Sequence, residues 1–239
     1  MKSQSLIIVF GIALVGCGNS GPKPVAKTPD VAEVKVTPQN QLTLFPLVEG
    51  NSWTYVMEVS AESVNQPKQT LKAEIVYKVT KVTKISADSA KATLSVMQDG
   101  KMQDEQEWGY DSKGIFQISA KASKIAFSPK QPVIRFPVKD QDTYKWDGSG
   151  QTPVGKLGTM KYGFKNDGMQ TVDTEMGQMN ALFIQSGGSF KVTNGIEGKV
   201  IMNAWYTPGI GLARFRQVIY VKGANSTITL RLKSYNVKK

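Results

Sequence analysis

From about position 42 onwards, apolar and polar residues alternate along the chain with a period of two. The alternation is clearest in residues 53–59, 71–79, 91–96 and 227–233. A period of two places one set of side chains on each face of an extended strand. Strands with one apolar and one polar face are typical of antiparallel sheets, so these segments predict an antiparallel sheet with one solvent-exposed face.

Turn-forming residues stand between several of the alternating segments. They are Asp99-Gly100, Asn166-Asp167-Gly168, Gly187-Gly188 and Asn194-Gly195. Each of these sequences predicts a hairpin between consecutive strands. Because no window of a dozen residues shows a sustained helical period, we expect at most one short helix.

Two segments, residues 200–206 and 212–221, are apolar on both faces and are therefore expected at the centre of the sheet. A long antiparallel sheet twists and curls. The predicted fold class is all-β: a strongly curved antiparallel sheet, either a half-barrel or a barrel, that forms a single domain over residues 42–239. The concave face is expected to hold the large apolar residues Trp53, Tyr55, Met57, Trp205 and Tyr206.

The first residues predict an export signal. Lys2 precedes an apolar run over residues 6–15, and this run is only half of the roughly 20 residues that a membrane-spanning helix needs. The sequence Leu14-Val15-Gly16-Cys17 resembles the lipobox of bacterial lipoproteins. The resemblance implies that residues 1–16 are a signal peptide and that Cys17 becomes the first mature residue and carries fatty acyl chains such as palmitate.

The residues that follow the cysteine predict how the domain is attached. Residues 17–41 are rich in Gly, Pro, Lys and Thr and show no sustained period, so we expect a lipidated cysteine followed by a flexible tether. Gly18, rather than Asp, follows the cysteine. By resemblance to lipoproteins of two-membrane bacteria, this implies a place in the cell envelope at the outer membrane.

The composition excludes most familiar catalytic sites. The chain contains no histidine and one cysteine, Cys17. Ser-His-Asp and Cys-His catalysis, histidine-ligated metals and an internal disulfide are therefore excluded. Chemistry by paired carboxylates, by a Ser-Lys dyad or by an oxygen-ligated metal stays open.

Acidic residues are densest in the segment that predicts one hairpin: Asp99, Asp104, Glu105, Glu107 and Asp111, beside Trp108 and Tyr110. Alternation places Glu105 and Glu107 on one face and Asp104 on the other, so a solvated hairpin edge is favoured over a sugar-cleaving carboxylate pair. Asp140 and Asp142 lack the remaining positions of a calcium-binding loop. We therefore predict no enzyme activity, no metal and no cofactor.

The chain is basic. Lys and Arg number 30 and Asp and Glu number 19, and removal of Lys2 with the signal leaves 29 − 19 = +10. Such a charge favours an anionic envelope component as a partner, although dispersed lysines are also typical of solvated strand faces. Basic and aromatic residues interleave at Tyr144-Lys145-Trp146 and Arg214-Phe215-Arg216, but the expected location outside the cytoplasm argues against a nucleic-acid partner.

Three short motifs resemble a group of secreted bacterial proteins, the TapB-like families of unknown function. The motifs are Phe45-Pro46-Leu47 with Gly50-Asn51-Ser52-Trp53-Thr54-Tyr55, the segment 172–182, and Trp205-Tyr206-Thr207-Pro208-Gly209-Ile210-Gly211-Leu212. The resemblance implies a strongly curved sheet, similar in outline to the half-barrels of the lipoprotein carriers LolA and LolB, and brings no catalytic residues. We expect Trp53, Tyr55, Trp205 and Tyr206 to be core residues, with a ligand-facing aromatic patch as the alternative.

The resulting hypothesis is a membrane-anchored, monomeric envelope lipoprotein that acts as a non-enzymatic binding or assembly module for an anionic envelope component or an envelope protein. The first alternative is a carrier or sensor of a hydrophobic ligand, either lipid or lipoprotein. The second alternative is a carboxylate-based hydrolase of polysaccharide.

Overall fold

The computed structural model describes residues 40–64, 66–120, 125–193 and 195–238. Residues 1–16, Cys17 and nearly all of the tether expected over residues 17–41 lie outside the described residues, so the signal peptide, the lipidation and the tether stay predictions. Among the described residues, no helix is long and apolar enough to cross a membrane.

A short 3-10 helix and twelve strands follow one another along the described chain. They are η1 (Gln41–Leu44), β1 (Ser52–Ser63), β2 (Gln66–Ser86), β3 (Ser89–Gln98), β4 (Lys101–Asp111), β5 (Gly114–Ala120), β6 (Ile125–Arg135), β7 (Thr143–Gln151), β8 (Leu157–Thr174), β9 (Gly177–Val192), β10 (Glu197–Thr207), β11 (Gly211–Val221) and β12 (Ala224–Asn236). The expectation of an all-β fold with at most one short helix is thus confirmed in the described part of the chain.

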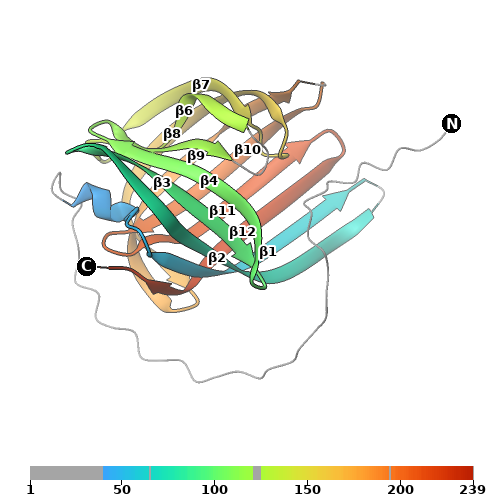
Figure 1. Ribbon diagram of the computed structural model, residues 1–239. Helices are drawn as coiled ribbons and strands as arrows, with labels where there is room; N and C mark the ends of the chain where they lie inside the picture. The colour runs from blue at the N-terminus through green and yellow to red at the C-terminus, as the bar shows by residue number, and fades with distance from the viewer. Residues whose placement is uncertain (1–39, 65, 121–124, 194, 239) are drawn as a thin grey trace, which may run out of the picture.

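The twelve strands form one closed barrel (Figure 1). Each strand pairs antiparallel with its neighbours in sequence, and β1 also pairs with β12, which closes the sheet. Closure gives each described strand a neighbour on both sides, although β6 and β7 pair only at Ser128 and Ser149. Of the two predicted shapes, the barrel is therefore confirmed.

The alternating residues fill the barrel interior. Trp53 and Tyr55 on β1 are completely buried, as are Leu94 on β3 and Leu232 on β12. At one end of the barrel, the segment that begins with η1 adds Leu44, Phe45 and Leu47 to the same core, each at most 5% exposed. We call this the η1 end.

Two of the expected turns join strands in the structure. Asp99-Gly100 connects β3 to β4, and both residues have positive φ, at 50° and 72°. Gly195 lies in the connection between β9 and β10, while Asn194 lies outside the described residues. The prediction of hairpins at these two places is confirmed.

The turn predicted at Asn166-Asp167-Gly168 is wrong, because these residues lie inside β8. They form an irregularity in the pairing of β8 with β9. The Asn166 side-chain oxygen accepts the Gly168 N–H at 3.1 Å, and the Asn166 N–H donates to the Asp142 carbonyl oxygen at 2.9 Å. These bonds satisfy the irregular backbone, so the strand continues past it as a β-bulge.

The turn predicted at Gly187-Gly188 is also wrong, because both residues lie in the middle of β9. A Cβ atom at Gly187 would approach the Val200 carbonyl oxygen to 2.7 Å, and one at Gly188 would collide with the Lys161 carbonyl oxygen. The two glycines therefore allow neighbouring backbones to approach closely, which is a second use of glycine in strands.

Candidate functional site

The first and last aromatic motifs meet at the η1 end of the barrel. Trp53 Nε1 donates to the Ile210 carbonyl oxygen at 2.5 Å, and the Tyr55 hydroxyl donates to the Leu212 carbonyl oxygen at 3.0 Å. Phe45 stacks on Trp53 with ring centroids 5.1 Å apart. These contacts tie β1 to a turn 157 residues further along the chain. The two motifs therefore act together to close this end of the barrel.

The four aromatic candidates do not form one patch. Trp53, Tyr55 and Tyr206 are buried in the interior, in agreement with the core interpretation. Trp205 lies on the outer face, because adjacent residues of a strand point to opposite faces and Tyr206 points inward. The expectation that Trp205 lies on the concave face is thus wrong.

Burial keeps the interior tyrosines protonated. Burial, with a smaller contribution from Asp104, raises the pKa of Tyr77 to about 12. Burial also raises the pKa of Tyr55, Tyr144 and Tyr206 above the usual value. At neutral pH these hydroxyls are therefore protonated and do not act as bases.

Asp104 and Glu107 of the acidic hairpin point to opposite faces of the barrel wall. Asp104 points inward, where its Oδ2 atom accepts from Gln106 Nε2 at 3.1 Å, and Gln106 Oε1 accepts from Trp108 Nε1 at 3.0 Å. Glu107 lies on the opposite face, 3.6 Å from Lys91 Nζ. The wall of the barrel therefore separates Asp104 from Glu107, and a carboxylate pair for sugar cleavage does not form there.

The loop between β6 and β7 contains Asp140 and Asp142. Asp140 Oδ1 accepts the Gln141 N–H at 2.9 Å, and Asp142 Oδ2 lies 3.9 Å from Arg135 Nη1. Within the described ranges, no three His, Cys, Asp or Glu side chains are grouped closely enough to hold a metal ion. The contacts of these aspartates order the loop.

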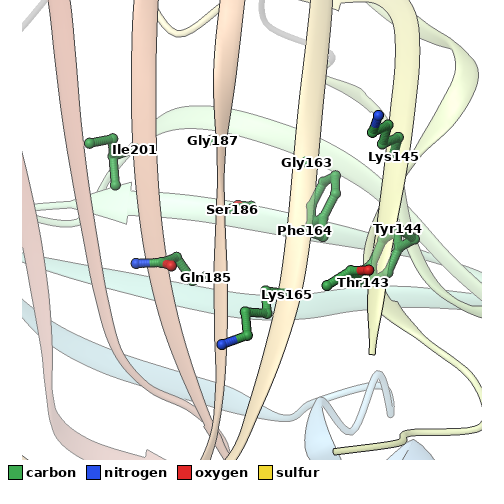
Figure 2. Close-up of a pocket in the computed structure, with 10 residues that line it drawn as sticks. All are labelled: Thr143, Tyr144, Lys145, Gly163, Phe164, Lys165, Gln185, Ser186, Gly187 and Ile201. Atoms are coloured by element: carbon green, nitrogen blue, oxygen red, sulfur yellow. The ribbon is translucent and has the colours of Figure 1, made fainter. Parts of the chain in front are cut away.

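A groove of about 650 Å³ lies on the outer face of the barrel across β7 to β10 (Figure 2). Gly163 on β8 pairs with Gly187 on β9, and these two glycines form its floor. Lys145 on β7 pairs with Gly163, and Ile201 on β10 pairs with Gly187. Figure 2 shows these four residues along one row. The row beside it contains Thr143, Lys165 and Gln185.

The fold does not require a glycine at position 163. A Cβ atom there would have no atom within 4 Å, and Gly163 is not among the residues with positive φ. Gly187, by contrast, has the Val200 carbonyl oxygen close by. A strand glycine costs about 0.5–1 kcal/mol relative to alanine. A glycine that the fold does not need, at the floor of a groove, is typical of a place where another molecule approaches the backbone.

An aromatic and cationic stack lies on the same outer face. Trp205 on β10 pairs with Phe183 on β9 and with Arg214 on β11. The rings of Trp205 and Phe183 are stacked 4.7 Å apart, and the Arg214 guanidinium carbon lies 5.5 Å from the Trp205 ring centre. Arg214 Nε is buried without a hydrogen-bond partner among the described residues. The stack forms a half-buried border to the row that contains Gln185 and Lys165.

We give the name β7–β11 face to nine outward-facing residues of these strands: Lys145, Lys165, Phe183, Lys199, Ile201, Trp205, Arg214, Arg216 and Tyr220. The same strands also carry two exposed ion pairs, Lys161 with Asp147 and Lys191 with Glu197. Lys165 pairs with Asp167. In the described part of the chain, Lys145, Lys199 and Arg216 have no ion-pair partner, while Ile201 and Tyr220 are 42% and 43% exposed. The face thus combines positive charge with exposed apolar side chains.

The sequence did not predict that these residues form one face. Sequence reasoning interpreted Gly187 as a turn, considered Lys145 and Arg216 only in connection with nucleic acid, and did not single out Gly163 or Ile201. The sequence feature that marks the face is the presence of apolar residues on both sides of residues 200–206 and 212–221.

Some solved structures resemble this chain in the outline of the fold, at low sequence identity. No family model and no curated protein matches the chain. A candidate lipoprotein from Parabacteroides distasonis is 12% identical with a TM-score of 0.48, and the match covers 81% of this chain and 98% of that one. A candidate exported protein with a YmcC-like fold from Bacteroides fragilis is 12% identical with a TM-score of 0.41, covering 80% and 98%. The hypothetical lipoprotein YmcC from Escherichia coli K12 is 11% identical with a TM-score of 0.35, covering 80% and 89%.

These structures are described as lipoproteins or exported proteins, the class of protein that the sequence resemblance named. The TapB-like name is not among their descriptions. At identities near 12% and TM-scores below 0.5, no function of theirs is carried over to this chain.

Proposed function

We propose that this chain is a membrane-anchored lipoprotein of the bacterial cell envelope and works as a non-enzymatic binding module, with its binding site on the β7–β11 face. The observation that carries the proposal is Gly163. It lines a groove of about 650 Å³ and has free space where a side chain would stand. A bound partner that approaches the backbone explains why a less stable residue occupies this position.

Charge indicates the kind of partner. Lys145 stands at one end of the groove and has no ion-pair partner among the described residues, and Arg216 on β11 has none either. Uncompensated positive charge attracts anionic molecules and repels cationic ones. An anionic component of the envelope therefore fits this face. Gly18 after the lipidated cysteine favours the outer membrane as its location.

A hydrophobic-ligand carrier is less well supported. At the η1 end, the interior is filled by Leu44, Phe45, Trp53 and Tyr55, all at most 3% exposed. A barrel whose interior is filled by its own side chains has no room there for a lipid chain. The outer groove is therefore the better site for a ligand.

The test is a substitution that fills the groove without disturbing the fold. Gly163→Val adds a side chain that strands favour at a position where a Cβ meets nothing. Ser60→Val, an outward position on β1, is the matched control for added bulk. A photo-crosslinking residue at Ile201 reports contact in cells, and the same residue at Val76 on β2 reports a wall outside the β7–β11 face.

We expect crosslinked adducts of protein, glycan or lipid from position 201 and none from position 76. Gly163→Val should abolish the adducts and Ser60→Val should leave them unchanged, with equal amounts of folded protein in each strain. If the adducts survive Gly163→Val at full strength, the groove is not the binding site.

A further inference from the structure

We infer that the β7–β11 face rests on the surface of a bilayer that contains anionic phospholipid, so that the protein contacts the membrane both through Cys17 and through this face. The inference rests on the proposed function and names the partner of the same site. It is carried by the order of charged and apolar residues on the face and by the place where the chain enters the barrel.

Cations and apolar side chains alternate on the outer side of β10 and β11. Lys199 and Ile201 point outward on β10, and Lys199 pairs with Tyr220 on β11. Ile201 is 42% and Tyr220 43% exposed. Arg216 lies two residue pairs from Ile201 along the same strands. Surfaces that bind bilayers combine apolar side chains, which enter the interface, with Lys and Arg, which pair with anionic headgroups.

The groove adds room for a headgroup. Its ends are formed by Lys145 on β7 and Ile201 on β10, and Lys165 lies in the adjacent row. The glycine floor lets a headgroup lie close to the wall while the ammonium of Lys145 stands beside it. A lysine ammonium is a mobile point charge that suits a phosphate group without fixed geometry.

The adjoining wall of β12, β1 and β2 also carries positive charge. Lys72 lies 3.3 Å from Glu58, and Lys233 pairs with Glu74. Lys78 and Lys84 on β2 are exposed and have no ion-pair partner among the described residues. The β7–β11 face therefore differs from that wall in its groove rather than in charge alone.

The tether enters the barrel beside the strands that carry the face. The Thr43 carbonyl oxygen accepts the Gly209 N–H at 3.0 Å, and Gly209 lies in the turn between β10 and β11. If Cys17 is acylated, 22 residues separate it from Asn40, and no chain of that length can span more than roughly 80 Å. The bilayer is then always within reach of β10 and β11, at a high effective concentration.

The test uses the complete mature chain, residues 17–239, with Cys17→Ser so that no acyl chain holds it to the membrane. Flotation with phosphatidylcholine vesicles containing 30% phosphatidylglycerol is compared with flotation with pure phosphatidylcholine vesicles. We expect binding to the first and little binding to the second. Lys145→Ala with Arg216→Ala should lower the affinity about 25-fold, since each cation near an anionic surface contributes about fivefold.

Two controls separate this contact from a general charge effect. Lys78→Ala with Lys84→Ala removes the same charge from exposed positions of β2 and should change the affinity less than threefold. Trp205 is an internal probe, because it lies on the outer face while Trp53, Trp108 and Trp146 point inward. Brominated phosphatidylglycerol should quench its fluorescence, and Trp205→Phe should remove that quenching.

Equal binding to both kinds of vesicle, no binding to either, or equal loss from the β2 control pair would overturn the inference. If vesicles do not bind but the adduct from position 201 still depends on Gly163, the binding site stands and its partner is another anionic molecule. If both are absent, the proposed function fails as well.

Discussion

Replacing Trp53 by alanine is the sharpest test of how the barrel is closed. The Trp53 side chain is completely buried, stacks on Phe45 at 5.1 Å and donates to the Ile210 carbonyl oxygen at 2.5 Å. Alanine removes the ring, leaves a cavity between β1 and the η1 segment, and deprives a carbonyl oxygen of its donor. All three changes occur at the point where the two ends of the sheet meet.

The expected magnitude follows from these contacts. A buried tryptophan replaced by alanine costs about 3–5 kcal/mol of unfolding free energy. For a domain of this size, each kcal/mol lowers Tm by about 2–4 °C, so Trp53→Ala should lower Tm by about 6–20 °C. Trp53→Phe keeps a ring against Phe45 but loses the donor to Ile210, and it should cost about 1–3 kcal/mol.

Trp205→Ala is the matched comparison, because the residue type is the same and the face is different. It loses a stack with Phe183 worth about 0.5–1.5 kcal/mol and a contact with Arg214 worth about 0.5–1 kcal/mol, and no interior cavity forms. Thermal and urea denaturation of the variants measure the difference. If Trp53→Ala melts within about 2 °C of the wild type, or no lower than Trp205→Ala, the proposed role of Trp53 in closing the barrel is wrong.

Four further predictions concern the strand glycines, Tyr77, Cys17 and the isolated domain. Gly163→Ala should raise the unfolding free energy by about 0.5–1 kcal/mol, whereas Gly187→Ala should lower it, since its Cβ would press on a neighbouring carbonyl oxygen; urea denaturation decides both. The pKa of Tyr77 is raised by burial to about 12 in the folded state against about 10 when unfolded, so its contribution to stability is complete below pH 10 and declines between pH 10 and 12, as urea denaturation across that range should show. Cys17→Ala should give an uncleaved or mislocalised precursor on fractionation, and full partition of a processed mutant into detergent would contradict the anchor. Residues 42–239 alone should be monomeric and free of bound lipid in native mass spectrometry, and a stoichiometric lipid adduct would favour the carrier alternative.

Local patterns predicted most of the strands and part of the core. Alternation in residues 53–59 placed Trp53 and Tyr55 inside, and both are completely buried. The Asp99-Gly100 turn was predictable because positive φ at both positions requires such residues. The sequence did not decide between a half-barrel and a barrel. Closure depends on β1–β12 pairs such as Trp53 with Tyr235, which lie near opposite ends of the domain, and no local pattern predicts such pairs.

The glycines show why part of the site could not be predicted. A Gly-Gly pair between apolar runs predicts a turn when its neighbours in space are unknown. In the structure, Gly187 faces the Val200 carbonyl oxygen and Gly188 faces that of Lys161, and both neighbours come from other strands. Gly163, which has no such neighbour, differs from Gly187 only in its surroundings. The distinction between a required and an unrequired glycine therefore exists only in three dimensions.

The exposure of the outer surface at residues 200–206 and 212–221 also could not be predicted from the sequence. Apolar residues on both sides of a strand predict a central strand covered on both faces, but every strand of a closed barrel has two neighbours and none is central. Val218, which points outward beside Ile201, is only 6% exposed, whereas Ile201 itself is 42% exposed. The neighbouring side chains thus cover one of these outward residues and leave the other open. No second layer of the described chain covers the outer side of Ile201. The partner that we propose for the β7–β11 face would account for the excess of apolar residues on β10 and β11.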